Sequence, residues 1–267
     1  MPDAIIDLAI FDEHGRCVPS SDLKAEVHRR TRRRFVCIQP EIDYSAIHSR
    51  IAGALNDDGG LSRDDFERQA RSVLDKVSRD PATSGLAKGI HLPFFLPRMP
   101  DALSRDIGSD LDKIYLPAVE KSFLDAHPQS SYTRHHKGSL TGQLSVTGGS
   151  RHDRLLQAVS RTTVVGYFFL ALQEYSVPAS VEQVRRLPDT FLLAGGADTC
   201  AAFAGSPSLL LNPDAYPPLL WLAALSAEKL QTAYHLEAYG RNLTFNRRVH
   251  FDQAAEYWAA GLTVLAE

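Results

Sequence analysis

At 267 residues the chain is long enough to bury a hydrophobic core, as one large domain or as two small ones. Its 44% hydrophobic and 23% charged residues are typical of a folded globular protein and exclude an intrinsically disordered one. The net charge of −3, from 29 basic and 32 acidic residues, provides no overall attraction to nucleic acid or to an anionic membrane surface. We therefore expect neither as a partner.

The cysteines and the apolar segments bear on the cellular compartment. The three cysteines, Cys17, Cys37 and Cys200, are far apart and form no CxxC pair, which argues against a zinc site built on thiolates. Such a sparse, odd number is typical of a reducing compartment. The chain starts with no secretory pattern, and its longest apolar run, residues 164–172, is well short of the roughly 20 residues that span a bilayer. We expect a cytoplasmic protein; no motif identifies a cofactor or an oligomeric state.

The first 100 residues contain both strand and helix patterns. Apolar residues 4–11 before a turn predict a strand, and Ser21 precedes a predicted helix over residues 22–34. Helices are also predicted from Asp43 to Leu55 and after Ser62, where apolar residues recur every three or four positions. Residues 89–100 contain three prolines and predict an extended connector, which is a possible boundary inside a single domain of residues 1–267.

The rest of the chain is predicted to be mainly helical. We expect helices over residues 109–126, 151–160, 163–174, 180–187 and 219–230, a polar loop over residues 130–150, and a last strand at residues 262–265. The fold class expected from these elements is α+β and mostly helical. Its β elements would be small ones near the N-terminus and a C-terminal hairpin.

The C-terminal hairpin has the clearest pattern in the sequence. Apolar residues alternate with polar ones over residues 234–238 and 243–251, on either side of a Gly-Arg-Asn sequence. A turn at Arg241-Asn242 places both apolar sets on one face. This register pairs Ala238 with Phe245 and Tyr234 with Val249. A shift of one residue would expose one of the apolar sets to water.

The polar face of this hairpin carries a candidate acid–base pair. The expected register places Glu237 opposite Asn246 and His235 opposite Arg248, so Glu237, His235 and Arg248 would cluster. A carboxylate beside an imidazole has the composition of an acid–base catalyst, and we take Glu237 and His235 as candidate catalytic residues. The alternative is a solvated strand face with a surface ion pair.

A second candidate lies in the sequence Gly195-Gly196-Ala197-Asp198-Thr199-Cys200. If the glycines form a turn and Asp198 caps a new helix, Cys200 lies in the first helical turn, where the helix dipole favours a thiolate nucleophile. If one helix runs from Asp189 to Ala204, Cys200 is a buried packing residue. Two adjacent glycines cost roughly 2 kcal/mol in a helix interior, which favours the break.

The best candidate for an anion site is the sequence from Gly148 to Arg154. A glycine pair before a hydroxyl residue at a helix start presents backbone N–H groups to a phosphate or carboxylate. Gly149, Ser150, Arg151 and Arg154 are therefore the candidate ligand-binding residues. No Gly-Lys-Ser/Thr sequence follows, so a nucleoside triphosphate is not implied. The alternative is an ordinary loop-to-helix junction with solvated arginines.

Two further clusters have simpler explanations. His135, His136 and His152, with Asp153, lack the spacing of a known metal motif, so we expect a polar loop and no metal. Arg29–Arg34 holds five arginines in six positions and could contact an acidic partner. We interpret it first as a solvated face or a salt-bridge network at a subunit contact.

No motif assigns a reaction to this chain. The function we expect is binding of, or action on, a small anionic ligand by Gly149, Ser150, Arg151 and Arg154, with Cys200, Glu237 or His235 as chemical partner. The alternative is a non-catalytic interaction protein that uses Arg29–Arg34. The two differ spatially, because the first requires residues 150–154 to share a cleft with Cys200 or with Glu237.

Overall fold

The computed structural model describes residues 10–28, 37–212, 217–229 and 231–267. Its α-helices are α1 (Tyr44–Leu55), α2 (Arg63–Arg79), α3 (Ile107–Asp110), α4 (Leu116–Ala126), α5 (Asp153–Arg161), α6 (Val177–Val184) and α7 (Gly196–Gly205). A 3-10 helix, η1 (Ser84–Lys88), and a π-helix, η2 (Leu111–Tyr115), complete the described helical segments.

One large mixed sheet forms the centre of the molecule. Its strands are β1 (His91–Leu96), β2 (Ser131–Arg134), β4 (Val164–Gln173), β5 (Leu192–Leu193), β6 (Leu219–Trp221), β8 (Thr232–Tyr239), β9 (Asn242–Val249) and β10 (Trp258–Leu265). The order is β1-β4-β10-β6-β8-β9-β2, and β5 pairs with β10. The pairs β6–β10 and β2–β9 are parallel and the others antiparallel. Strands β3 (Leu144–Val146) and β7 (Leu225–Ala227) form a separate small sheet.

The prediction of a mostly helical protein with small β elements was wrong. Helices comprise 33% and strands 24% of the described residues, and the fold is α+β around the eight-stranded sheet. Residues 163–174 and 219–230, both predicted as helices, form β4, β6 and β7. Strand β4 is buried over nearly its whole length, so its apolar residues follow each other without the alternation that distinguishes a half-exposed strand from a helix.

The N-terminal predictions were only partly testable. Residues 1–9 and Arg29–Arg34 lie outside the described residues. The described part of the predicted helix, residues 22–28, is irregular and forms a single bridge between Val27 and Tyr175. Of the predicted strand over residues 4–11, only residues 10 and 11 are described, and Phe11 forms an isolated bridge with Cys17 across the turn.

The proline-rich segment is part of the sheet. Residues 91–96 form β1, which lies at one end of the strand order and pairs only with β4 among the described strands. Pro93 lacks a backbone N–H and is tolerated in such an edge strand. The predicted extended and buried character of this segment was right, although it is a strand of the central sheet and not a connector.

The C-terminal hairpin was predicted correctly apart from its register. Strands β8 and β9 pair Ala238 with Leu243 and Tyr234 with Arg247, which differs from the expected register by two residues. Gly240 adopts a φ of +59°, and Tyr239 pairs with Asn242, so the turn is at Gly240–Arg241. Because side chains alternate with a period of two, this shift keeps both apolar sets on the same face.

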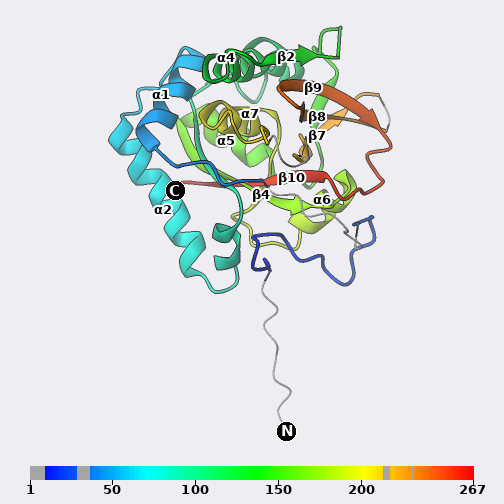
Figure 1. Cartoon of the computed structure of the whole chain (residues 1–267). Coiled ribbons are helices and arrows are strands. Elements are labelled where there is room, and N and C mark those ends of the chain that lie inside the picture. The colour runs from blue at the N-terminus through cyan, green and yellow to red at the C-terminus, as the bar shows by residue number, and fades with distance from the viewer. Residues whose placement is uncertain (1–9, 29–36, 213–216, 230) are drawn as a thin grey trace.

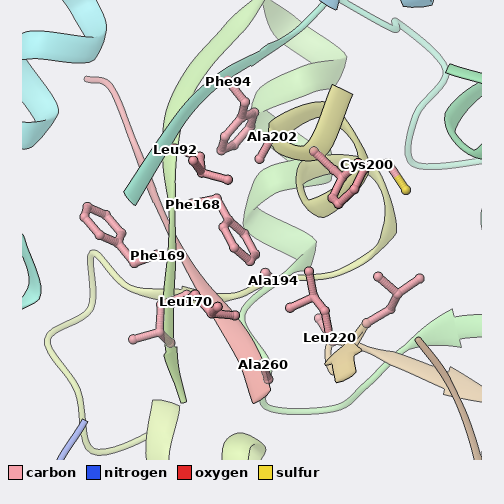
Figure 2. Packing of buried hydrophobic residues seen from close by; sticks show 14 of the residues in the cluster. Leu92, Phe94, Phe168, Phe169, Leu170, Ala194, Cys200, Ala202, Leu220 and Ala260 are labelled. Atoms are coloured by element: carbon pink, nitrogen blue, oxygen red, sulfur yellow. The ribbon is translucent and has the colours of Figure 1, made fainter. Parts of the chain in front are cut away.

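Helix α7 lies at the centre of the fold. It packs on β1 and is covered by α1 and α4, which lie above it in the view of Figure 1, while β4 and β10 lie below. Figure 2 shows Phe94 of β1 and Phe168 of β4 beside Ala202 of α7, within one continuous hydrophobic core. The N-terminus of α7 therefore opens inside the protein, where its unpaired backbone amides are shielded from bulk water.

Candidate functional site

The two glycine-containing segments singled out in the sequence lie side by side. The backbone N–H of Leu193 donates to the carbonyl of Ser150 at 2.9 Å. Strand β5 ends at Leu193, and the chain enters α7 at Gly196, so a helix through residues 189–204 is excluded. A Cβ at position 195 would lie 2.6 Å from the imidazole of His152. Glycine is required at 195 because the histidine ring occupies the space of a side chain.

Asp198 holds the start of α7 in place. Asp198 is the third residue of α7, so it is not the residue before the helix that one of the two interpretations expected. Its carboxylate accepts a hydrogen bond from the backbone N–H of Gly195, the residue before the helix, at 2.9 Å. The N–H of Thr199 donates to the same oxygen at 3.0 Å, and the Thr263 hydroxyl on β10 donates to the other at 2.7 Å. Three donors fix this fully buried carboxylate in one orientation.

His152 is the polar side chain next to this carboxylate. Its side chain is 3% exposed, and its Nδ1 lies 3.9 Å from Oδ2 of Asp198, beyond hydrogen-bond distance. Within the described residues Nδ1 has no hydrogen-bond partner. A buried unpartnered ring nitrogen is uncommon in folded proteins, because burial without a partner costs free energy. Its position beside a fixed carboxylate is therefore the first indication of a functional site.

His152 lines a cavity at the N-terminus of α7, which we call the α7 cavity. The cavity has about 30 Å³ of free space, enough for one or two water molecules or for the polar end of a small ligand. Three ionisable side chains, Asp110, Tyr115 and His152, line it together with Gly196 and Ala197 of α7. The other walls are apolar, from Leu96, Met99, Ala102, Ile107, Leu111, Leu155, Leu156 and Val159. A few convergent polar groups in an apolar cavity are characteristic of small-molecule sites.

The π-helix η2 supplies one wall of the cavity. It begins at Leu111, ends at Tyr115 and precedes Pro117, which has no N–H to donate to the carbonyl four residues back. The N–H of Leu116 instead donates to the carbonyl of Leu111, five residues back. Such π-turns are rare and occur frequently at functional sites. This one places Leu111 and Tyr115 on the cavity wall.

The charges in the cavity wall are balanced. Arg105 donates to both oxygens of Asp110, with N–O distances of 2.6 to 2.9 Å, so this carboxylate is neutralised by a bidentate partner. Burial raises the pKa of Tyr115 well above its ordinary value, and its hydroxyl therefore remains a hydrogen-bond donor. The backbone N–H groups of Gly196 and Ala197 have no acceptor within the described chain. An anion entering here would meet donors and the positive end of the helix dipole.

The predicted ligand-binding arginines are engaged elsewhere. The guanidinium of Arg151 donates to the carbonyls of Leu187, Pro188 and Phe191 at 2.9 to 3.2 Å, and Arg154 donates to the carbonyl of Asp189. Both side chains hold the loop after α6 against the start of α5. Anion binding by these two guanidinium groups stays a prediction, and their donors are already used by protein carbonyls.

Gly149 and Ser150 complete the same junction. Gly149 adopts a φ of +83°, and a Cβ there would lie 2.3 Å from the guanidinium of Arg185. Ser150 is fully buried, and its hydroxyl accepts from the backbone N–H of His152 at 3.3 Å. Gly149 and Ser150 form the turn before His152, which lines the α7 cavity. Direct contact of these two residues with a ligand stays a prediction.

Cys200 is the fifth residue of α7, beyond the first turn where it was expected. It is fully buried, and burial raises the pKa of its thiol far above the ordinary value, with the carboxylate of Asp198 adding to the effect. A nucleophilic cysteine needs a lowered pKa and access to solvent. The nucleophile role of Cys200 therefore stays a prediction that this environment does not favour.

The structure brings His235 and Glu237 together in the sheet interior. Nε2 of His235 lies 3.1 Å from Oε1 of Glu237, and Nη2 of Arg248 lies 3.4 Å from Oε2. Both members of the pair are buried, so the face is not the solvated one considered as the alternative. They meet as neighbours two apart on β8; across the ladder His235 pairs with Asn246 and Glu237 with Thr244.

The electrostatics of this pair favour a neutral imidazole and an ionised carboxylate. Burial lowers the pKa of His235, an effect that the hydrogen bond to Glu237 only partly offsets. Burial alone would raise the pKa of Glu237, but the contacts with His235, Tyr239 and Arg248 outweigh it and lower the pKa. Nδ1 of His235 has no partner in the described chain. A catalytic role for the pair stays a prediction.

The other candidates add no site. His135 and His136 follow β2, and no group of three metal-capable side chains occurs among the described residues. A role for Arg29–Arg34 stays a prediction, since the segment lies outside them. Among the described helices, none is both long enough and apolar enough to cross a membrane.

Sequence reasoning missed the combination of His152 with Asp198, Asp110 and Tyr115. His152 was considered as a metal ligand and Asp198 as a helix cap, and no local pattern connects segments so far apart in the chain. The sequence signals nearest to the cavity were the two glycine-containing sequences, from Gly148 to Arg154 and from Gly195 to Cys200, considered there as separate sites.

Comparison of the chain with protein-family models, with curated proteins and with solved structures found no match.

Proposed function

We propose that the protein binds a small anionic ligand in the α7 cavity and exchanges a proton with it through His152. The observation that supports this is the buried, unpartnered imidazole of His152, which lies between a fixed carboxylate and the N-terminus of a buried helix. A histidine beside a carboxylate that can accept from its Nδ1–H is the usual arrangement of a general acid–base.

The proton chemistry follows from the geometry of the ring. Nδ1 is the nitrogen nearest to Asp198, and the carboxylate is held on its other sides by Gly195, Thr199 and Thr263. A small movement that closes the 3.9 Å gap would give an Nδ1–H to carboxylate hydrogen bond and leave Nε2 to give or take a proton. Catalytic hydrogen bonds are often long before a ligand is bound.

The electrostatics of the cavity support an anionic group. Asp110 is neutralised by Arg105, so it offers little repulsion. The free amides of Gly196 and Ala197 and the hydroxyl of Tyr115 provide donors, and a protonated His152 would supply a positive charge. We place this activity in the cytoplasm, in keeping with three cysteines that are all unpaired.

The test is an NMR titration of the histidine side chains with formate, acetate and inorganic phosphate at constant ionic strength. We expect at least one of these anions to shift the ring signals of His152. The dissociation constant of that anion is compared between the wild type and His152→Gln from the backbone amide signals of Gly196 and Ala197, which both proteins keep, and should rise at least tenfold in the variant. The matched control is His14→Gln, since His14 is exposed and is not part of the cavity lining. If none of the anions shifts His152, or if His152→Gln binds as tightly as the wild type, the proposal is wrong.

A further inference from the structure

Resting on the function proposed above, we infer that the α7 cavity selects a compact monocarboxylate, of the size of formate or acetate, over inorganic phosphate and over longer acids. The inference depends on three properties of the cavity: the number of donors that face it, the charge that it can compensate, and its free volume.

The donors match a carboxylate. Four groups of the lining residues are potential donors to a ligand, namely the amides of Gly196 and Ala197, the hydroxyl of Tyr115 and the ring of His152. A carboxylate offers about four acceptor positions on two oxygens, so the four donors would satisfy it. Phosphate has twice as many oxygens. Those left over would face side chains such as Leu155 and Val159, where a buried acceptor has no partner.

The charge balance also favours a monoanion. Arg105 is committed to Asp110 and adds no free positive charge. What remains is the helix dipole, equivalent to about half a charge, and any proton on His152, whose charge is shared with the carboxylate of Asp198 at 3.9 Å. Together they compensate at most a single negative charge. A phosphate carries up to two at neutral pH, and the second would be buried without compensation.

The volume limits the ligand to a few atoms. The cavity has only about 30 Å³ of free space, and its lining includes Leu111 and Leu155, which are buried. A longer chain would have to displace the partly exposed residues of the lining, among them Met99 and Leu156. Overpacking of this kind costs free energy, so affinity should fall as the acid lengthens.

The experiment measures dissociation constants of formate, acetate, butyrate and inorganic phosphate from the ring signals of His152 at constant ionic strength. We expect formate or acetate to bind at least tenfold more tightly than butyrate and phosphate. In Leu156→Ala the enlarged cavity should reduce the preference for acetate over butyrate at least threefold. The matched control, Leu124→Ala, removes a partly buried leucine of α4 outside the cavity and should leave that preference unchanged.

The outcomes separate the two proposals. If phosphate or butyrate binds as tightly as acetate, the ligand class is wrong while anion binding at His152 stands. If none of the four shifts His152, both proposals fail. If Leu156→Ala does not fold, Met99→Ala also removes a lining side chain and takes its place. A preference for acetate over butyrate that is unchanged in the folded variant would contradict the volume argument.

Discussion

At the scale of single residues, the close approach of His152 to Gly195 is the most consequential contact of the fold. The ring lies where a side chain of residue 195 would be, and the same contact places the imidazole beside Asp198 and the cavity. The glycine at position 195 therefore has two effects. It lies in the turn between β5 and α7, and its missing side chain leaves the space that the ring of His152 occupies.

This contact predicts the effect of Gly195→Ala. The added methyl group would meet the His152 ring at 2.6 Å, so the ring or the backbone must shift. We expect the free energy of unfolding, measured by urea titration, to fall by about 1–3 kcal/mol, and anion binding to be lost.

Gly53→Ala is the matched control for this substitution. Gly53 lies inside α1 with open space around its Cα, so alanine should raise the free energy of unfolding by up to about 1 kcal/mol. Equal effects of the two substitutions would contradict a specific contact between Gly195 and His152.

At the scale of elements, the hairpin of β8 and β9 carries the clearest pH dependence. In the folded protein the pKa of His235 is lowered by burial, whereas in the unfolded chain it is near 6.5. The unfolded state therefore binds more protons as the pH falls below about 6.5, and stability is lost. The lowered pKa of Glu237 acts in the same direction at more acidic pH, because its unfolded form protonates first.

We expect the free energy of unfolding to decrease from pH 7 to pH 5, and less steeply in His235→Gln than in the wild type. The measurement is a series of urea titrations across this range. The two proteins are compared by the slope of the free energy of unfolding against pH, which is not affected if the variant is less stable by the same amount at every pH. Burial also lowers the pKa of His91, so part of the slope should remain. A slope in His235→Gln equal to that of the wild type would show that His235 is not buried in its neutral form.

At the scale of the whole molecule, the large sheet connects segments from both halves of the chain. Strand β1 comes from the predicted connector at residues 89–100, and it pairs with β4, which pairs with the C-terminal strand β10. Helix α7 then packs on β1 between α1 and α4. If residues 1–100 folded as an independent portion, the edge strand β1 would be separated from its partner β4 in this sheet.

This connectivity predicts a single cooperative unfolding transition. The two tryptophans, Trp221 in β6 and Trp258 in β10, have ring centroids 5.0 Å apart at the middle of the sheet, so fluorescence reports on that region. Circular dichroism in the far ultraviolet reports mainly on the helices. We expect the same midpoint in urea for both signals. Separate midpoints would indicate two independently folding portions.

The elements predicted correctly are those with local signals. Helices α1 and α2 begin after Asp43 and Ser62, whose side chains accept from backbone N–H groups three residues on, and one face of each carries regularly spaced apolar residues. The hairpin also had a local signal, but its register depended on which residue took the left-handed conformation.

The sequence by itself determined the composition class, the capped helices and the presence of the C-terminal hairpin, and it favoured the break at Gly195. Each of these depends on hydrogen bonds and periodicity within a few residues. Only the tertiary structure decided that residues 164–173 and 219–221 are strands, since residues buried on both sides of a sheet have no distinguishing period. It also decided the candidate site. His152 meets Asp198 because α5 and α7 start beside each other at β5, and no local pattern encodes a contact between separate elements.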